Sequence, residues 1–365
     1  MMSQWFPSRT LTLYLARMFV GRIFSVLAML VLVLQMLDLL GESGKILAYH
    51  GNGERDVWLY VLLRCPQLVQ QFLPYSVLLA ALFTFFPLNQ NSETIAMRAA
   101  GLSAHQILAP LLAAAVAIAG ISFAFNELVV TKTSGRLKDW QAVQYGPVPV
   151  DTGMRGNVYM TDGRNILHAD TVTGDPAAPT MRGVTWYARD PLGTITAQVT
   201  SPRAQWVKTG WRLESPVLLD VRTTSQRAVP VMIVGGGIHP REIEISNVDA
   251  DRLNIIDLAR AIDMLHANGR RTAELEGKWW HKISKPMSAV LMPLLAGLAA
   301  FGLARSGQLL LRAVAGMAMG FAYFVVDNTA LAIGNFGGYP PLIAAWGPFL
   351  LFLLIGETVL IRTEE

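Results

Sequence analysis

The sequence predicts a membrane α-helical protein in which six transmembrane helices, three and three, flank an inserted all-β domain of jelly-roll-like type. Hydrophobic residues make up 52% of the 365-residue chain and charged residues only 15%, whereas soluble domains average about 25% charged residues. The mean hydropathy of +0.38 excludes a disordered or fibrous protein. The single cysteine, Cys65, excludes an internal disulfide framework. The apolar residues are concentrated in six stretches, and one polar block separates the third stretch from the fourth.

Each of the six stretches is long enough to cross about 30 Å of hydrocarbon at ~1.5 Å per helical residue. They are Ile23–Leu40, Val57–Leu88, Ile107–Val130, Ile283–Ala304, Ala313–Ile333 and Pro340–Ile361. The polar block, Thr131–Gly277, carries 17 Lys/Arg and 16 Asp/Glu, and it is long enough to form a domain with its own core. We therefore divide the chain into residues 1–130 with helices one to three, 131–277 with the β domain, and 278–365 with helices four to six.

The N-terminal stretch predicts a retained helix and not a cleaved signal peptide, because no small-x-small cleavage site follows it. Lysine and arginine are enriched on the cytoplasmic side of membrane proteins, so the short segments between the spans indicate orientation. One set of these segments holds Arg9, Arg17, Arg22, Arg98, Arg305, Arg312 and Arg362. The opposite short loops hold only Lys45 and Arg55. We expect a multi-pass protein of the cell inner membrane with both termini in the cytoplasm and the polar domain in the periplasm.

The polar block is predicted to be mainly β-structure, because segments rich in Val, Ile, Thr, Trp and Tyr recur between turn signals. The predicted strands are Asn157–Thr161, Asn165–Val172, Gly183–Arg189, Thr194–Thr200, Ala204–Lys208 and Trp211–Leu213. Strands at this spacing favour an antiparallel sandwich or jelly roll over βαβ units. After them, Asn254–Ala267 is predicted to be an amphipathic helix, capped by Asn254 and ended by Gly269, that links the domain to the fourth span.

No catalytic machinery is recognisable in the sequence. Gly44-Lys45 resembles the end of a phosphate-binding loop, but Leu39 stands where the first glycine is needed and Ile46 where Ser or Thr must hold magnesium. The six histidines lack the spacing of metal ligands. The net charge of +4 is too small to indicate a nucleic-acid partner. We therefore expect a chain that is not an enzyme and has no catalytic residue, cofactor or metal ion, so that the energy for any work comes from elsewhere.

A charged side chain inside a membrane span has a high free energy unless it faces a cavity or a partner. Asp38 and Glu127 lie near the outer ends of spans one and three, Arg64 lies near the start of span two, and Asp327 lies deep in span five. For Asp38, Glu127 and Arg64 two interpretations stay open, a side chain that reaches the interface or one with a functional role. For Asp327 the two are a structural hydrogen bond and a relay.

The loop between spans two and three contains the segment Asn91–Gly101. Its pattern predicts a cap at Asn91-Ser92, a helix of about two turns, and an end at Gly101. So small an element cannot hide both Ile95 and Met97. A helix of this kind at the membrane surface is suited to docking into the groove of another protein. The alternative is a surface helix that only closes the loop.

These residues together resemble the lipopolysaccharide export permeases of the YjgP/YjgQ family. The resemblance rests on the three-plus-three spans around a periplasmic β domain, the loop Ser92-Glu93-x-x-x-Met97-x-x-x-Gly101 and the tail Gly338-Tyr339-Pro340-Pro341. Trp280-x-Lys282-Ile283-x-x-Pro286 and the Val326-Asp327 pair favour the LptG branch of that family. The similarity covers nearly the whole chain and is weak across the β domain. No single motif is diagnostic, but their order and spacing are.

The resemblance implies the permease subunit of an ABC transporter that extracts lipopolysaccharide from the inner membrane and passes it to a periplasmic bridge towards the outer membrane. It implies membrane lipid and four partners: an LptF-like permease chain that forms a heterodimer with this one, an LptB-like ATPase dimer, an LptC-like bitopic protein and lipopolysaccharide itself. ATP hydrolysis would be supplied by the ATPase chain. The 91–101 helix would couple to that ATPase, with Glu93 as its charged contact and Ile95, Met97 and Arg98 as its packing and rim.

The phosphates of such a ligand need cations at the outer mouth, because charge-assisted contacts are the strong ones. The resemblance leads us to expect a phosphate-binding ring of Lys45, Arg64, Arg136 and Lys138. The chain departs here from the family pattern of several lysines along the outer half of span one, since it has Gln35, Gly41 and Glu42 there. This departure would allow a lipid A with fewer phosphates.

Two other functional classes stay open. A proton-coupled secondary transporter would use Asp327 and Glu127 as a relay, would respond to a proton gradient and would need no ATPase partner. A membrane-anchored periplasmic sensor or scaffold would use the β domain for ligand binding and the helices as an anchor. Six spans and a docking helix are more than an anchor needs.

Overall fold

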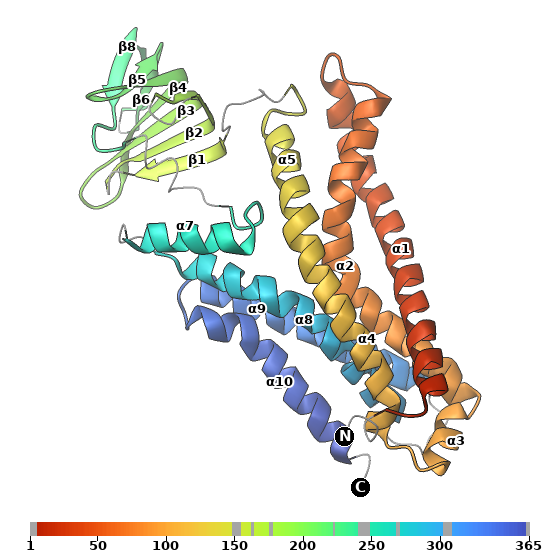
Figure 1. Ribbon diagram of the computed structural model, residues 1–365. Coiled ribbons are helices and arrows are strands. Elements are labelled where there is room, and N and C mark those ends of the chain that lie inside the picture. The colour runs from red at the N-terminus through yellow and green to blue at the C-terminus, as the bar shows by residue number, and fades with distance from the viewer. Residues whose placement is uncertain are drawn as a thin grey trace. The chain divides into compact units, whose positions relative to one another are not determined.

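The computed structural model of this chain describes residues 6–147, 155–161, 164–174, 178–221, 223–239, 249–267, 271–301 and 309–362. The chain divides into two compact units, drawn in Figure 1. The helical unit comprises residues up to 42, residues 59–134 and residues from 250 onward. The sheet unit comprises residues 43–58 and 135–249.

The N-terminal part of the chain is helical, as the apolar stretches predict. Its elements are α1 (Arg9–Ala48), α2 (Glu54–Gln90), α3 (Glu93–Ala99), α4 (Ala104–Phe125), the π-helix η2 (Asn126–Val130) and α5 (Thr131–Ala142). The third long helix therefore continues beyond Val130, where the sequence analysis begins the polar domain. It continues because residues 131–142 contain no proline and a single glycine, Gly135, so that polarity alone does not end the helix.

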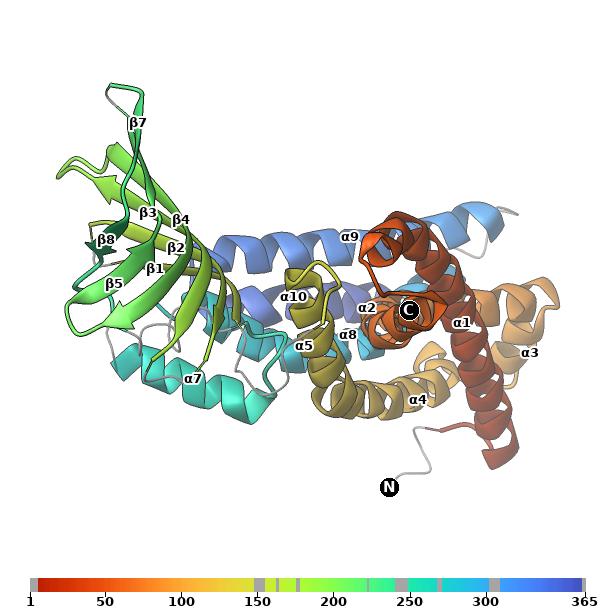
Figure 2. The ribbon, with the colours of Figure 1, turned by 90° about the horizontal axis from the view of Figure 1, so that it is seen from above.

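The C-terminal part contains α7 (Ile255–Ala267), α8 (Ala273–Phe301), α9 (Leu309–Asn335) and α10 (Pro341–Arg362). The predicted cap of α7 is confirmed, because Asn254 Oδ1 accepts from the backbone N–H groups of Ile256 at 3.1 Å and Asp257 at 2.8 Å. Its predicted end, Gly269, lies outside the described residues, as do Ala304 and Arg305. α8 packs against α4, α9 and α10, and Figure 2 shows α8, α9 and α10 running alongside one another.

Five helices in the described part of the chain are long and apolar enough to cross a membrane. They are α1, α2, the continuous segment Ala104–Ala142, α9 from Val314, and α10. α8, whose charged residues lie between Glu274 and Lys285, is not counted among these helices, which are drawn from the described residues alone. The protein thus has multiple membrane helices, and the sixth span stays a prediction.

α1 joins the core of the helical unit along one narrow stripe. Leu15, Phe19, Ile23 and Leu27 recur at every fourth position, the spacing that places side chains on one face of a helix, and all four are buried. Beyond Leu27 the same face continues only with the partly buried Val31 and the buried Gln35, and the large apolar side chains from Met29 to Leu40 are mostly exposed. Most of the surface of α1 is therefore available to lipid or to other chains.

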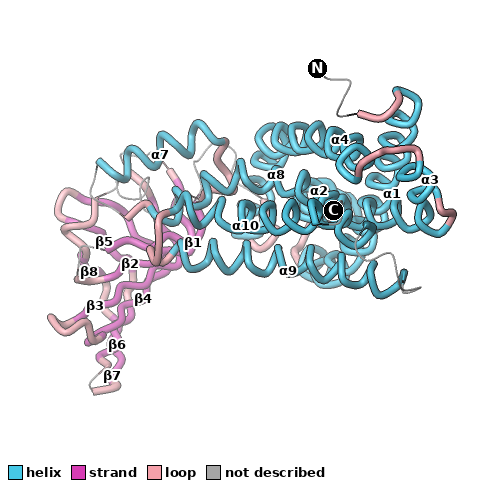
Figure 3. The backbone as a smooth tube through the Cα atoms, turned by 90° about the horizontal axis from the view of Figure 1, so that it is seen from below, coloured by secondary structure: helices cyan, strands magenta, loops and turns pink. Residues whose placement is uncertain are grey.

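The sheet unit contains one antiparallel sheet, coloured magenta in Figure 3. Its strands are β1 (Arg155–Thr161), β2 (Ile166–Thr173), β3 (Thr180–Arg189), β4 (Ile195–Val207), β5 (Gly210–Glu214), β6 (Val217–Asp220), β7 (Ser225–Ala228) and β8 (Val231–Val234). The order β1-β2-β3-β4-β5-β8 forms the main path, and β6 joins β4 to β7. The long strand β4 has two partners, because residues 203–207 pair with β5 and residues 197–200 with β6.

The inserted antiparallel β domain predicted from the sequence is confirmed, with two differences in detail. The segments Thr194–Thr200 and Ala204–Lys208 form the single strand β4. The strands β6, β7 and β8, which are only four residues long, are not predicted from the sequence. β7 is exposed at every position and so carries no apolar alternation. The core of the sheet surrounds Trp211, whose Nε1–H donates to Ile238 O at 2.9 Å.

Candidate functional site

α3 is the short helix predicted between the second and third long helices. Its predicted N-terminal cap is wrong, because Ser92 has a left-handed backbone (φ 57°) and its side chain makes no capping hydrogen bond. Its C-terminal end agrees with the prediction. Gly101 has φ +86°, and the N–H groups of Gly101 and Leu102 donate to Arg98 O at 2.9 Å and Met97 O at 3.2 Å.

The four predicted coupling residues occupy different sides of α3. Ile95 is 67% exposed, and Glu93 is half-buried. Met97 packs against the core of the helical unit. The guanidinium of Arg98 lies over the ring of Phe301 at the end of α8, 5.4 Å from its centroid, in a cation–π contact. Two residues thus hold α3 in place while Ile95 points away from the unit.

Arg64 and Asp38, two of the predicted intramembrane charges, form an ion pair with each other. Arg64 Nε lies 3.2 Å from Asp38 Oδ2, and its Nη2 lies 3.3 Å from Oδ1, so both carboxylate oxygens are engaged. Tyr60 donates its hydroxyl to Asp38 Oδ2 at 2.5 Å, and Arg64 Nη1 donates to Gln67 Oε1 at 2.6 Å. The pair is partly exposed, at 31% for Arg64 and 24% for Asp38. The guanidinium is therefore oriented in advance but still accessible.

The other three predicted phosphate ligands belong to the sheet unit. Lys45 and Arg136 are exposed, and Lys138 Nζ pairs with Asp249 Oδ2 at 2.5 Å. Lys45 lies near the end of α1, whereas Arg136 and Lys138 lie on α5. Asn52 joins these two segments.

The amide of Asn52 makes that connection by donating to Ile46 O at 2.9 Å and to Tyr145 O at 2.8 Å. It thereby holds the end of α1 against the chain that follows α5. Arg64 belongs to the helical unit, so a ring that includes all four cations stays a prediction.

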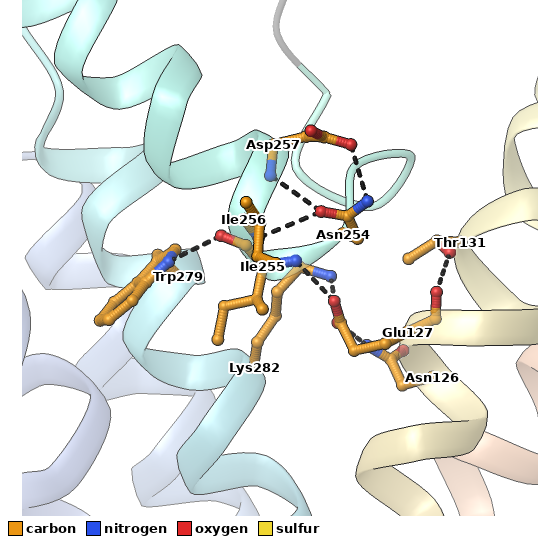
Figure 4. Close-up of polar contacts among 9 residues, drawn as sticks. All are labelled: Asn126, Glu127, Thr131, Asn254, Ile255, Ile256, Asp257, Trp279 and Lys282. Carbon is orange, nitrogen blue, oxygen red and sulfur yellow. Dashed lines mark hydrogen bonds and ion pairs between the residues drawn. The ribbon is translucent and has the colours of Figure 1, made fainter.

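The carboxylate of Glu127 bonds Lys282, the backbone of Ile255 and Asn126, as Figure 4 shows. Its Oε1 accepts from Lys282 Nζ of α8 at 3.0 Å, and its Oε2 accepts from the backbone N–H of Ile255 at 2.5 Å. The two side chains are about equally buried, with 11% of Glu127 and 10% of Lys282 exposed. Ile255 opens α7, and the N-terminus of a helix favours a negative charge. One carboxylate thus joins the third long helix to α7 and α8.

The backbone around Glu127 explains its position. Residues Asn126–Val130 form one turn of π-helix, in which the chain is wider than in an α-helix and which often occurs at functional positions. Thr131 Oγ1 donates to Glu127 O at 2.9 Å, and Asn126 Nδ2 donates to Glu127 Oε1 at 3.1 Å. On α8, Trp279 Nε1–H donates to Ile255 O at 3.0 Å. Lys282 was visible in the sequence, but nothing there predicted Glu127 as its partner.

Asp327 on α9 faces α8, with Oδ2 3.5 Å from His281 Nε2. Both side chains are nearly buried, at 10% for Asp327 and 13% for His281. Two alternatives were predicted for Asp327, a structural hydrogen bond and a relay. Both need a polar, titratable neighbour such as His281. Glu127 and Asp327 have different partners, Lys282 and His281, which are consecutive on α8. In the described residues no group of three or more His, Cys, Asp or Glu side chains could hold a metal ion.

Comparison with known proteins finds relatives over nearly the whole chain. The family model described as "Lipopolysaccharide export system permease LptF/LptG" matches residues 13–362. The lipopolysaccharide export system permease protein LptG of Escherichia coli (strain K12) is 27% identical over 322 residues, which cover 86% of this chain and 88% of the relative. The LptG protein of Haemophilus influenzae is 24% identical over 363 residues, which cover 98% of this chain and 99% of the relative.

Proposed function

This chain belongs to the LptF/LptG family of lipopolysaccharide export system permeases, and on that premise we propose that it is an LptG-type permease subunit of an ABC transporter. Its substrate is lipopolysaccharide, which the complex extracts from the inner membrane and passes to a periplasmic bridge towards the outer membrane. The chain itself is not an enzyme. A separate ATPase dimer of LptB type hydrolyses ATP.

The observation that carries the proposal is the outward apolar side chain on α3. Ile95 is 67% exposed, while Arg98 and Met97 of the same helix are engaged with the helical unit. An apolar residue presented on a fixed short helix fits a groove on another protein. We propose that this groove belongs to the ATPase and that Glu93, beside Ile95, makes the charged contact. The helix then transmits ATPase closure to the spans. We propose accordingly that α3 and both termini lie in the cytoplasm and the sheet unit in the periplasm.

The apolar surface of α1 supports the need for partner chains. In its most apolar part only 17% of the residues are buried, against 61% for α2. Lipid can cover such a helix, but it also suits packing against further helices. We propose an LptF-like chain as the heterodimer partner and an LptC-like bitopic protein as a further neighbour.

The proposed ligand contacts are cationic. Arg64 is oriented by Asp38 yet partly exposed, and a guanidinium binds phosphate oxygens in a bidentate manner. Lys45, Arg136 and Lys138 lie on two segments that Asn52 holds together. We propose that these four residues bind the phosphates of lipopolysaccharide.

The test is purification of the tagged chain from its native membrane in mild detergent, followed by mass spectrometry and reconstitution into proteoliposomes. We expect an ABC-type ATPase, a second permease chain and bound lipopolysaccharide in the purified complex. We also expect release of lipopolysaccharide to a periplasmic acceptor only when ATP is added. Transport that follows a proton gradient without ATP or an ATPase would overturn the proposal in favour of a secondary transporter. In that case Asp327 and Glu127 become the residues to replace.

A further inference from the structure

Pro87 interrupts the hydrogen bonding of α2 near its C-terminal end. In an α-helix the N–H of each residue bonds the carbonyl four residues earlier. Proline has no N–H, so the carbonyl of Phe83 loses its regular donor while α2 continues to Gln90. In a membrane helix such a carbonyl is stabilised by another donor, from a neighbouring helix or from water.

Arg22 of α1 supplies that partner, with Nη1 2.5 Å from Phe83 O. Arg22 is half-buried and precedes Ile23, which belongs to the buried stripe of α1. A guanidinium keeps its charge in proteins, and its hydrogen bonds are stronger than those between neutral groups. The contact joins two residues 61 positions apart. It connects the N-terminal half of α1, which we call its inner half, to the interrupted turn of α2.

The interrupted turn leads directly into α3. Pro87 O accepts from Asn91 N–H at 2.8 Å where α2 ends, and α3 begins at Glu93. A second route returns from α3 to the same part of α2. Arg98 of α3 covers Phe301, whose ring lies edge-on to Phe85 with centroids 5.3 Å apart. Phe85 is two residues from Phe83, so α3 is connected to this turn both through the chain and through side chains.

α1 has a second polar attachment to α2 further along, where Asp38 bonds Tyr60 and Arg64. Between the two attachments, the side chains of α1 beyond Leu27 are largely exposed. Two polar contacts thus join α1 to α2, and one short apolar stripe joins α1 to the core of the helical unit. The contact nearer α3 is the one made by Arg22.

We infer that Arg22 is a positioning residue for transport. Through the carbonyl that Pro87 leaves without a donor, it fixes the inner half of α1 to the part of α2 that continues into α3, so that displacement of α3 moves α1. The inference rests on the proposed function, in which α3 receives the motion of the ATPase. It assigns to Arg22 a role separate from ligand binding and from ATPase docking.

Four variants in the full complex test the inference: Arg22→Ala, Arg22→Lys, Pro87→Ala and the double variant Arg22→Ala/Pro87→Ala. Pro87→Ala returns an N–H to residue 87, so the carbonyl of Phe83 regains its helical donor without any contact to α1. Two quantities are measured in proteoliposomes or on the purified complex, the lipopolysaccharide released per ATP hydrolysed and the melting temperature. Arg17→Ala is the control, because Arg17 is exposed and lies on the same helix.

We expect Arg22→Ala to lower the melting temperature and to reduce lipopolysaccharide released per ATP by about tenfold, the effect of losing one hydrogen bond to a charged group. Arg22→Lys keeps a charged donor and should stay close to wild type, as should the control. The double variant should regain the melting temperature but not the coupling, because its carbonyl is bonded while α1 stays unattached. Since that carbonyl has its donor, the double variant also gives a folded sample if Arg22→Ala does not assemble.

Recovery of both quantities in the double variant would overturn the inference, because Arg22 would then only satisfy a carbonyl. Wild-type coupling in Arg22→Ala would overturn it as well. Failure of the proposed function looks different, because then the wild-type complex releases no lipopolysaccharide on addition of ATP.

Discussion

Glu127 and Lys282 form a nearly buried ion pair between η2 and α8, with Oε1 and Nζ 3.0 Å apart. The second oxygen of the carboxylate accepts from the first N–H of α7. A pair of this kind gives little net stability relative to apolar residues, but removal of one partner leaves a charge without compensation. The pair therefore joins the first residue of α7 and α8 to the third long helix.

Replacing either partner alone is expected to destabilise the helical unit. Glu127→Ala or Lys282→Ala should lower the free energy of unfolding by about 3 kcal/mol, because each leaves an unpaired buried charge. Chemical or thermal unfolding of the purified protein in detergent measures the change. The exposed pair Glu274–Lys278, 2.7 Å apart on α8, is the matched control, and Lys278→Ala should change stability by less than about 1 kcal/mol. Equal effects at the two pairs would show that the burial of Glu127 has no energetic consequence.

Arg64 is expected to hold ligand phosphate. Arg64→Ala should reduce the lipopolysaccharide that co-purifies with the complex by about tenfold, because it removes one bidentate charge-assisted contact. Asp38→Asn should retain or increase binding, since it removes a competing carboxylate, and added salt should weaken binding in the wild type. Lipid mass spectrometry at two salt concentrations measures these changes.

The control for Arg64 is Arg55→Ala, which removes the same charge from an exposed position of the same helix, α2. Unchanged lipopolysaccharide in Arg64→Ala would assign this arginine to the Asp38 contact alone.

Ile95 and Glu93 are expected to act at the ATPase interface without affecting folding. Ile95→Asp should weaken association with the ATPase by about thirtyfold, the effect of losing an interface residue worth about 2 kcal/mol. Glu93→Lys should leave the complex folded but abolish ATP-driven export. Co-purification and an export assay measure the two effects. The control is Leu192→Asp, which replaces another exposed aliphatic residue with the same acid, and an ATPase complex that tolerates Ile95→Asp equally well would contradict the docking role of α3.

The last turn of α9 has no room for a side chain at Gly334. A Cβ at Gly334 would lie 2.5 Å from the Cβ of Ala344, which is fully buried and has no flexible end that could move. Gly334→Ala should therefore destabilise the protein by about 1–3 kcal/mol. Gly347→Ala in α10 is the control, because its nearest contact would be an ordinary 3.6 Å to Ile343, and alanine favours the helix by ~0.5–1 kcal/mol. Melting temperatures that move in opposite directions would support this account, and a stabilised Gly334→Ala would refute it.

Prediction from sequence succeeded where the physics is local. Hydropathy over about 20 residues located the long apolar helices, and the cap at Asn254 followed from side-chain chemistry within three residues. It failed where local signals were weak or equivocal. Serine is a common N-cap residue, but the backbone of Ser92 is left-handed. The strand β7 is too short and too exposed to show an alternation of apolar and polar residues.

The candidate site was predictable only as a set of residue types. The acidic and basic residues of the spans were recognised because a charge in hydrocarbon has a high free energy. Their partners, however, lie far away in sequence: Asp38 is 26 residues from Arg64, and Glu127 is 155 residues from Lys282. No periodic pattern encodes such a pairing. Arg22 was counted only for its charge, because its partner is a backbone carbonyl exposed by a proline 65 positions later.

The sequence by itself determined that this is a membrane protein of several long helices with an inserted β domain, because hydropathy, charge distribution and turn chemistry act over one element at a time. It also carried the family resemblance. Only the tertiary structure decided which carboxylate faces which cation, which carbonyl Arg22 bonds, and which residue of α3 is left outward. Those outcomes depend on the packing of helices against one another, and a buried charge or an open carbonyl is stabilised by whichever donor that packing brings within 3 Å or so.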